Sequence, residues 1–348
     1  MCRPERVPSR SPHCQGQGYT PRMAGSGKVT PRVLIVGWGF LGAAIGGRLL
    51  ADGVDVTGLT RSRTWRSEAG RAEGARIVVG DARDSVIVED AIYDVDHVVF
   101  SAGGVTPPSA AADPPGATMG MLLPLLGVLE SLRDRPNVSL TYISSGGAVY
   151  GDPVHLPVSE SDATQPISPY GASHLAAEIY AQMYGRRSGA SLHIVRCANV
   201  YGPYQAHDRD QGAVAVFLDR ISRELPIRIF GDGSALRDYV FVADVADVVA
   251  RIVVGGLDVG TVNLGSGRGL TVLEIVRAIS DAAGKPAHID FAPGRDFDVR
   301  GVILDISRLQ SFIAYRPTDF VRGLALTAAS YSQTVLGRAT AQTEILTS

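Results

Sequence analysis

The sequence predicts an α/β fold in which a doubly wound parallel sheet is combined with a smaller C-terminal domain. Three observations favour this class: short apolar runs alternate with helical patterns, the first run ends in a glycine-rich turn, and the pattern changes after about residue 200. Strands that alternate with helices are typical of a parallel sheet covered on both faces. Ligands of such sheets bind at the carboxyl ends of the strands, so the residues after each strand are the candidates for function.

The first strand and the turn after it carry the clearest signal. Val33–Val36 is an apolar run, and a helical pattern starts after a G-x-G-x-x-G motif. In this motif the first glycine permits a tight turn, the second lets the backbone approach a pyrophosphate, and the third lets the helix pack closely on the strand. The helix N-terminus adds unpaired N–H groups. We therefore expect a dinucleotide to bind at Gly37, Gly39, Phe40, Leu41 and Gly42.

The end of the second predicted strand, 54–60, indicates which dinucleotide binds. An NAD site usually has Asp or Glu there, about 20 residues past the glycines, to bind the ribose 2′-hydroxyl. This chain has Thr60, Arg61, Ser62 and Arg63 instead. Two guanidinium groups and two hydroxyls suit a 2′-phosphate, so the sequence favours NADP, with NAD as the alternative. A solvated basic loop without a role in binding is the competing interpretation.

Four further strands are expected before residue 200, at 77–81, 97–104, 139–145 and 192–197. A loop rich in proline and alanine follows the second of these, and an apolar helix, interrupted by Pro124, is expected at 119–132. The ends of the strands at 77–81 and 97–104 extend the predicted cofactor site to Asp81, Ala82, Ser101, Ala102 and Gly103. Ser144 and Ser145 end the strand at 139–145.

The segment Ser168–Glu178 predicts a helix that begins near Pro169, since proline suits the first helical turn. Tyr170 then lies in the first turn, and His174 lies one turn later on the same face. Beyond it, short strands are expected at 227–230, 237–242 and 263–265, and Thr271 is a predicted N-cap.

Composition limits the remaining possibilities. The 348 residues carry a formal net charge of −2, which gives no basic footprint for nucleic acid. No run of about 18 apolar residues predicts a membrane span. The 3 cysteines and 7 histidines lack metal-ligand spacing, so we expect no metal site. Three cysteines cannot form a disulfide framework either, so we expect a reducing compartment and a cytoplasmic location.

The chain is expected to divide into four parts. Residues 1–30 are predicted to be a disordered extension, and 331–348 a tail. Residues 31–200 are expected to form the dinucleotide-binding domain, with a return segment at about 237–262, and 201–330 the substrate-binding part.

These motifs, in this order, resemble the extended short-chain dehydrogenase/reductases, in particular the NAD(P)-dependent nucleotide-sugar epimerase/dehydratase family with its Rossmann-type domain. The resemblance covers about Arg32 to Gly323. Besides the glycine motif it rests on Gly-Asp at Asp81, S-S-x-x-x-V-Y-G at Ser144, S-P-Y-G at Ser168, R-x-x-N-x-Y-G-P at Arg196, Gly-Asp-Gly at Gly231 and R-D-Y-V at Arg237.

The resemblance implies that Tyr170 is the general acid/base at a sugar hydroxyl or ketone, while hydride moves to or from the nicotinamide. In the family a lysine four residues later lowers the pKa of the tyrosine and holds the ribose; here that position is His174. The family's catalytic Ser/Thr position is Gly146, so Ser145 is the nearest substitute. We expect Tyr170 and His174 to contact the cofactor, and His174, when protonated, to depress the pKa of Tyr170.

The resemblance also implies that Asn199, Arg237 and Arg295 bind the substrate, with the two arginines on a nucleoside diphosphate. We also expect Ser144, at the strand end, to bind the substrate. A homodimer is an open expectation. The basic loop after the second strand favours an NADP(H)-dependent ketoreductase acting on an NDP-keto-deoxyhexose, in deoxysugar biosynthesis. The alternatives are an NDP-sugar 4-epimerase such as UDP-glucose 4-epimerase, and a dinucleotide-binding protein that has lost catalysis.

Overall fold

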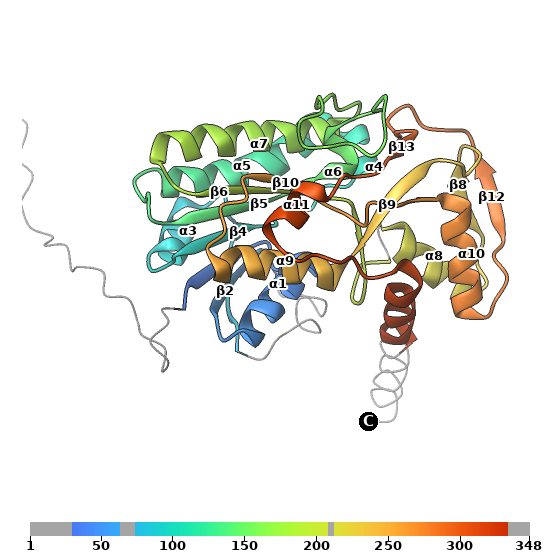
Figure 1. Ribbon diagram of the computed structural model, residues 1–348, viewed down its shortest axis with the longest axis horizontal. Helices are drawn as coiled ribbons and strands as arrows, with labels where there is room; N and C mark the ends of the chain where they lie inside the picture. Colours follow the sequence, from blue (N-terminus) through green and yellow to red (C-terminus); the bar gives the residue numbers. More distant parts are fainter. Residues whose placement is uncertain (1–29, 63–73, 208–211, 333–348) are drawn as a thin grey trace, which may run out of the picture. The chain divides into compact units, whose positions relative to one another are not determined.

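The computed structural model describes residues 30–62, 74–207 and 212–332. Seven strands form one parallel sheet in the order β10-β6-β5-β4-β1-β2-β3 (Figure 1). They are β1 (Arg32–Val36), β2 (Asp55–Thr60), β3 (Arg76–Val79), β4 (His97–Phe100), β5 (Ser139–Ser145), β6 (Leu192–Cys197) and β10 (Thr261–Leu264). The predicted doubly wound sheet is thereby confirmed. The predicted extension at 1–30 and tail at 331–348 lie almost wholly outside the described residues, as does Arg63.

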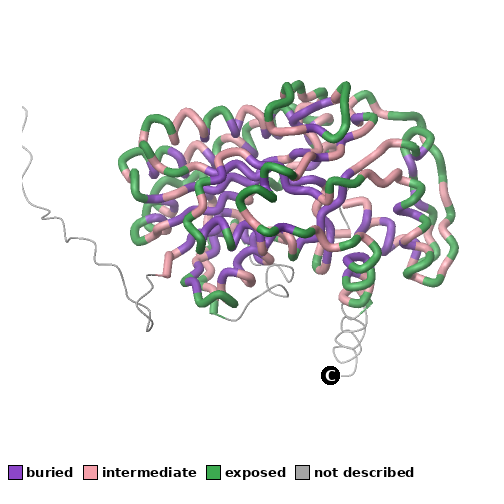
Figure 2. Tube along the Cα trace, in the orientation of Figure 1, coloured by how far each residue is buried: buried purple, intermediate pink, exposed green. Residues whose placement is uncertain are grey.

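Helices cover both faces of this sheet. On one face α1 (Phe40–Ala51) packs against α9 (Val242–Gly255). On the other lie α3 (Ser85–Ile92), α4 (Pro107–Ala112), α5 (Pro114–Leu132) and α7 (Pro169–Ser188). Side chains of a strand alternate between the faces, so Val33 and Ile35 enter one core, while Leu34 and Val36 enter the other. Figure 2 shows the resulting buried layer along the central strands.

The segment between β4 and β5 differs from the prediction. It contains the short α4, where a loop was expected, and α5 starts at Pro114 and continues through Pro124. The prolines that indicated a loop occupy the first turns of α4 and α5, where a missing N–H costs nothing. By length and composition alone α5 could cross a membrane, and its own residues Leu125 and Val128 are fully buried in the core.

The second half of the chain builds a smaller region. A four-stranded sheet contains β7 (Asn199–Tyr201), β9 (Leu236–Phe241), β11 (Gly269–Thr271) and β13 (Gly301–Val302). Beside it, α8 (Ala213–Ser222) packs on α10 (Val272–Ala283), and β8 (Ile227–Phe230) pairs with β12 (Ile289–Ala292). Thr271 caps α10 in a capping box with Glu274, as expected from the sequence. The rest is α6 (Gly146–Val149), α11 (Ser307–Phe312) and helical residues 320–332.

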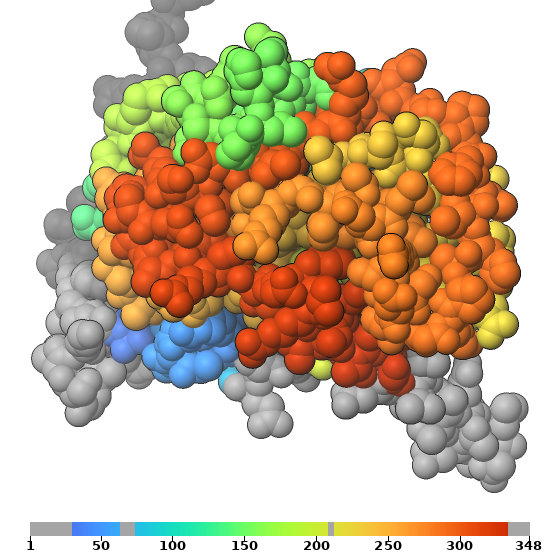
Figure 3. All heavy atoms as spheres, turned by 45° about the vertical axis from the view of Figure 1, so that its right-hand side comes forward, coloured from blue at the N-terminus to red at the C-terminus, as the bar shows by residue number. Residues whose placement is uncertain are grey.

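After β9 the chain returns to the first sheet: α9 packs against α1 on one face of it, and β10 pairs with β6. Residues from β9 onward, orange to red, cover most of the face in Figure 3, with the green segment after α6 above them. The carboxyl ends of the parallel strands therefore lie next to the smaller region, where a ligand can contact both.

Candidate active site

The glycine turn between β1 and α1 has the geometry of a dinucleotide loop. Gly37 has a φ of 101°, and a Cβ there would lie 2.5 Å from the backbone nitrogen of Ala102. A Cβ at Gly42 would collide with the carbonyl oxygen of Gly37. Gly39 differs, since no heavy atom lies within 4 Å of its Cβ position, and the same is true of Gly103 after β4. The first and third glycines serve internal packing, whereas Gly39 and Gly103 border open space, on the side where the motif predicts a pyrophosphate.

The neighbouring strand ends support this loop. The Ser101 hydroxyl donates to the carbonyl oxygen of Gly37 at 3.1 Å, which ties β4 to the turn. Phe40 and Leu41 are half-buried in the first turn of α1, and Ala82 is buried beside α5. The residues predicted from the sequence therefore gather at one edge of the sheet.

The adenosine end of this edge is basic. Arg61 is exposed, and its Nη2 lies 3.0 Å from the Cβ position of Gly104, so the guanidinium extends from β2 toward the loop after β4. Thr60 donates to the carbonyl oxygen of Ser62 at 3.0 Å. Asp81 is held by Arg83 through contacts of 3.0 and 2.6 Å, and these hydrogen bonds keep the pKa of its carboxyl below the usual range. Among the described residues at the end of β2, none is acidic.

Tyr170 stands at the start of α7 on the same edge. Ser168 caps the helix by accepting a hydrogen bond from the Gly171 N–H at 3.1 Å, so the predicted helix start is confirmed. The ring of Tyr170 meets the ring of His174 edge-on, with centroids 4.7 Å apart.

His174 does not have the environment expected of a charged group. Its side chain is 9% exposed, and Nδ1 lies 2.9 Å from the hydroxyl of Tyr142. Burial lowers the pKa of His174 to about 4, so the imidazole is neutral at pH 7. The expectation that a protonated His174 depresses the pKa of Tyr170 is therefore wrong. The reason is that the side chain points beneath α7 toward β5, a burial that helical spacing alone does not reveal.

The two serines at the end of β5 point in different directions. Ser144 is 3% exposed and donates to Glu178 Oε1 at 2.5 Å, so it faces the interior and does not lie where a substrate could reach it, contrary to expectation. Ser145 is half-buried and precedes α6 as its N-cap. At Gly146 a Cβ would lie 2.7 Å from Leu304 Cδ1 and 2.9 Å from the Arg196 carbonyl oxygen. The family's catalytic hydroxyl therefore has no room at 146, which leaves Ser145 as the nearest hydroxyl.

A buried polar network behind the site was not expected. Glu178 accepts from Arg196 Nε at 3.0 Å and Nη2 at 2.7 Å, and Arg196 Nη1 donates to the Tyr150 hydroxyl at 3.0 Å. Tyr150 in turn donates to Asn263 Oδ1 at 2.7 Å. The network links α7, β6, the C-cap of α6 and β10. The sequence signal that could have indicated this network is Glu178, which lies eight residues after Tyr170 and one helical turn after His174.

The three predicted substrate residues have different surroundings. Asn199 is half-buried at the start of β7, with Oδ1 3.5 Å from the Cβ position of Gly147. Arg237 is half-buried on β9, donates to the Leu236 carbonyl oxygen at 2.9 Å and forms no ion pair with any described carboxylate. Its pKa is lowered by burial. Arg295 is paired with Asp298 at 2.7 Å, and its guanidinium lies 4.0 Å from the ring centroid of Phe230.

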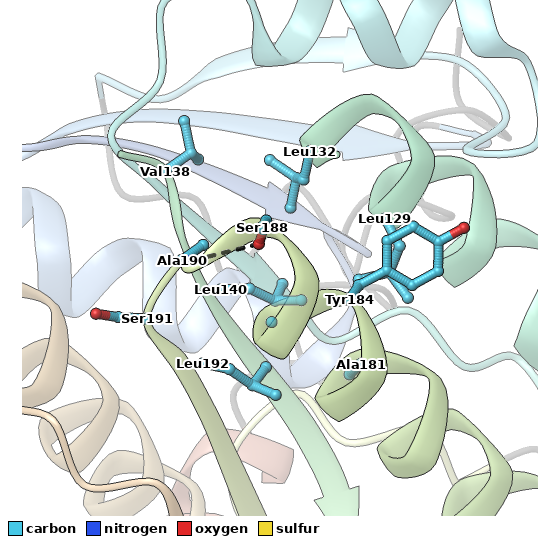
Figure 4. Close-up of a pocket in the computed structure, with 11 residues that line it drawn as sticks. Leu129, Leu132, Val138, Leu140, Ala181, Tyr184, Ser188, Ala190, Ser191 and Leu192 are labelled. Carbon is cyan, nitrogen blue, oxygen red and sulfur yellow. Dashed lines mark hydrogen bonds between the residues drawn. The ribbon is translucent and has the colours of Figure 1, made fainter. Parts of the chain in front are cut away.

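A small apolar pocket lies elsewhere. It opens at the amino ends of β5 and β6, between the last turns of α5 and α7 (Figure 4). Its lining includes Leu132, Leu140, Tyr184 and Leu192 and bears no charged side chain. The pocket is at the opposite end of these strands from Ser145 and is not part of the candidate site. The described residues also contain no cluster of three metal-ligating side chains.

Comparisons with known proteins agree with this geometry. The model of the NAD dependent epimerase/dehydratase family matches residues 33–265. A UDP-glucose 4-epimerase of Mycolicibacterium smegmatis is 33% identical over 305 residues, 85% of this chain and 97% of that protein. The dTDP-4-dehydro-6-deoxyglucose reductase of Escherichia coli is 33% identical over 191 residues, 54% of this chain and 60% of that protein.

Solved structures lead to the same family. The UDP-glucose 4-epimerase of Thermus thermophilus, solved in complex with NAD, has a TM-score of 0.81 at 34% identity and covers 86% of this chain and 99% of its own. The UDP-glucose 4-epimerase of Thermotoga maritima, solved with UDP-glucose, has a TM-score of 0.82 at 28% identity, covering 87% and 99%. The chain therefore belongs to the NAD-dependent epimerase/dehydratase family, within the extended short-chain dehydrogenase/reductases that its motifs predict.

Proposed function

We propose that the protein is an NDP-sugar 4-epimerase that uses a bound nicotinamide dinucleotide. The observation that carries the proposal is the similarity to UDP-glucose 4-epimerases along nearly the whole chain, together with Tyr170 at the sheet edge where the glycine turn lies. The basic loop after β2 alone favoured a reductase, but the reductase relative matches only 54% of this chain. The full-length relatives favour the epimerase.

The residues divide the work as follows. When bound, the nicotinamide supplies a hydride acceptor and donor. Tyr170 takes the proton of the sugar hydroxyl and returns it, and the Ser145 hydroxyl shares that oxygen. Arg237 holds the diphosphate, because its guanidinium is half-buried without an ion-pair partner among the described carboxylates. Asn199, at the start of β7, which pairs with β9, orients the sugar.

The test is the interconversion of nucleotide sugars. The purified protein, supplied in turn with UDP-glucose and dTDP-glucose, should form the 4-epimer in a reaction followed by proton NMR, without net oxidation or reduction of the dinucleotide. Tyr170→Phe serves as the inactive control. Failure to epimerise either sugar, with dinucleotide bound, would overturn the assignment.

A second candidate is the NADP(H)-dependent ketoreductase. Arg61 favours it, because the guanidinium lies at the end of β2, where a 2′-phosphate would bind and where no described residue is acidic. This reaction consumes one NADPH for each 4-keto sugar reduced, so NADPH absorbance separates it from epimerisation. A third outcome, dinucleotide binding without turnover of either substrate, would identify a protein that has lost catalysis.

A further inference from the structure

A buried tyrosine on β5 is in direct contact with the histidine beside Tyr170. Tyr142 is 1% exposed, and its hydroxyl lies 2.9 Å from Nδ1 of His174 on α7, the helix that runs along β5 in Figure 1. The His174 ring also meets Tyr170 edge-on, with centroids 4.7 Å apart. The three aromatic side chains thus form one cluster that joins β5 to the start of α7.

The protonation states of this pair determine which nitrogen of His174 carries the proton. Burial lowers the pKa of His174 to about 4, and burial, reinforced by Glu178 and Tyr170, raises the pKa of Tyr142. At neutral pH the phenol keeps its proton and the imidazole is neutral. The buried Tyr142 hydroxyl has no other hydrogen-bond acceptor among the described residues, so it donates to Nδ1, and the single ring proton of His174 is then on Nε2.

Nε2 of His174 is not fully buried, although the residue as a whole is. In the part of the chain that the structure describes, the buried side-chain polar atoms without a partner are His193 Nδ1 and Gln205 Oε1. Nε2 of His174 has no hydrogen-bond partner among the described residues, yet it is not one of these buried atoms, so it reaches solvent. The ring therefore presents an N–H donor next to Tyr170.

We propose that Tyr142 is a positioning residue: its hydroxyl holds His174 in the Nε2–H form, so that the ring offers a neutral donor to a ligand hydroxyl bound beside Tyr170. A ligand hydroxyl can accept from this N–H, and two ligands bring hydroxyls, the ribose of the dinucleotide and the sugar of the substrate. Only the identity of this ligand depends on the proposed function. The state of the histidine does not.

The first experiment reads that state directly by nitrogen NMR on protein labelled at its histidines, with the His174 signals identified from His174→Gln. The parent protein should show a pyridine-type Nδ1 and a pyrrole-type Nε2. Tyr142→Phe should let the Nδ1–H form appear. Tyr184→Phe, on the same helix as His174, loses a hydrogen bond to Glu130 of α5; it is the matched control and should change nothing. An Nδ1–H form in the parent, or no change in Tyr142→Phe, would overturn the proposal.

The second experiment identifies the ligand by binding. Tyr142→Phe should weaken one ligand about three- to tenfold, the effect of one neutral hydrogen bond. Weaker NAD or NADP with unchanged UDP-glucose assigns the donor to the ribose, and the reverse result, with UDP unchanged, assigns it to the sugar. Unchanged affinity for NAD, NADP and UDP-glucose contradicts the donor role. If Tyr142→Phe does not fold, two variants of His174 replace it. His174→Gln, which keeps a neutral donor, should retain the ligand affinity that His174→Leu loses. Equal ligand affinity in these two variants contradicts the donor role. Absence of turnover in the parent protein would contradict the proposed function and would leave the role of Tyr142 unchanged.

Discussion

At the scale of single residues, the hydroxyl of Tyr170 is the group on which the proposed chemistry depends. Tyr170→Phe removes only that oxygen from a helix whose cap and packing are otherwise unchanged. General acid/base catalysis contributes about 10²–10⁴-fold, so turnover should fall by that factor while the variant still folds and still binds the dinucleotide. Steady-state kinetics and cofactor titration measure both. Tyr180→Phe, at an exposed position of the same helix, is the control. Parent-like turnover in Tyr170→Phe would remove the tyrosine from the mechanism.

The two arginines of the predicted diphosphate site should differ in their effects. Arg237 forms no ion pair with a described carboxylate, so Arg237→Ala should lose a charge-assisted contact worth about 1.5–3 kcal/mol, roughly ten- to a hundredfold in UDP affinity. Arg295 already pairs with Asp298 and lies over Phe230, so its guanidinium is less available and Arg295→Ala should have the smaller effect. Isothermal titration with UDP decides, and equal losses would contradict this ranking.

At the scale of elements, the turn between β1 and α1 separates a folding role from a binding role. Gly39→Ala should fold like the parent, because nothing lies within 4 Å of the added carbon and φ is −107°. Its dinucleotide affinity should fall, since the carbon occupies the space left for the pyrophosphate. Gly37→Ala should instead lower the free energy of unfolding, because its carbon meets Ala102 at 2.5 Å and φ is 101°.

Gly53→Ala provides the control for these two variants. Gly53 has a φ of 79° but open space around its Cβ position, so its replacement measures backbone strain alone, about 1–2 kcal/mol. Gly37→Ala should exceed that loss in a chemical denaturation series. If Gly39→Ala binds NAD and NADP as tightly as the parent, the open space is not where the phosphates lie.

Elements could be predicted from the sequence wherever one local signal decides them. The apolar runs located β5 and β6 at their observed bounds, and Thr271 marked the start of α10. The prolines before Pro124 misled, because proline signals both a loop and a first helical turn, and only the surrounding packing distinguishes them. The states of Ser144 and His174 were beyond reach for a related reason: their partners, Glu178 and Tyr142, are 34 and 32 residues away along the chain.

At the scale of the whole molecule, the sheet order brings distant segments to one edge. The ends of β1, β2, β4 and β5 are neighbours or near neighbours in the parallel sheet, and β9, which carries Arg237 in the smaller region, is followed by α9 and β10, through which the chain returns to that sheet. A dinucleotide on the glycine turn and a nucleotide on the smaller region would therefore meet near Tyr170. The same packing buries His97, His174 and His193, so the stability of the fold depends on pH.

Stability should fall as the pH is lowered through the range just below the ordinary pKa of histidine. Burial lowers the pKa of His97 to about 3 and that of His174 to about 4, and it also lowers the pKa of His193. Above about pH 6.5 these groups are neutral in both the folded and the unfolded chain, so they add no pH dependence. Below it, the unfolded chain binds protons that the folded chain does not, and the free energy of unfolding declines by about 2 kcal/mol for each of His97 and His174 by pH 5.

Urea denaturation between pH 7.5 and pH 5 measures this loss. Asp238 acts in the opposite direction, because burial raises the pKa of its carboxyl. As the pH falls, the folded chain binds this proton at a higher pH than the unfolded chain does. The net decline in the free energy of unfolding is therefore smaller than the sum for the histidines. His97→Gln keeps a group that can bond to Thr141 but cannot titrate, and it should take up about one proton fewer on unfolding at pH 5. His155→Gln, at an exposed position, controls for the loss of a histidine as such. A free energy of unfolding that is constant from pH 7.5 to pH 5, or an identical pH dependence in His97→Gln and the parent, would mean that the buried imidazoles are not held neutral by the fold.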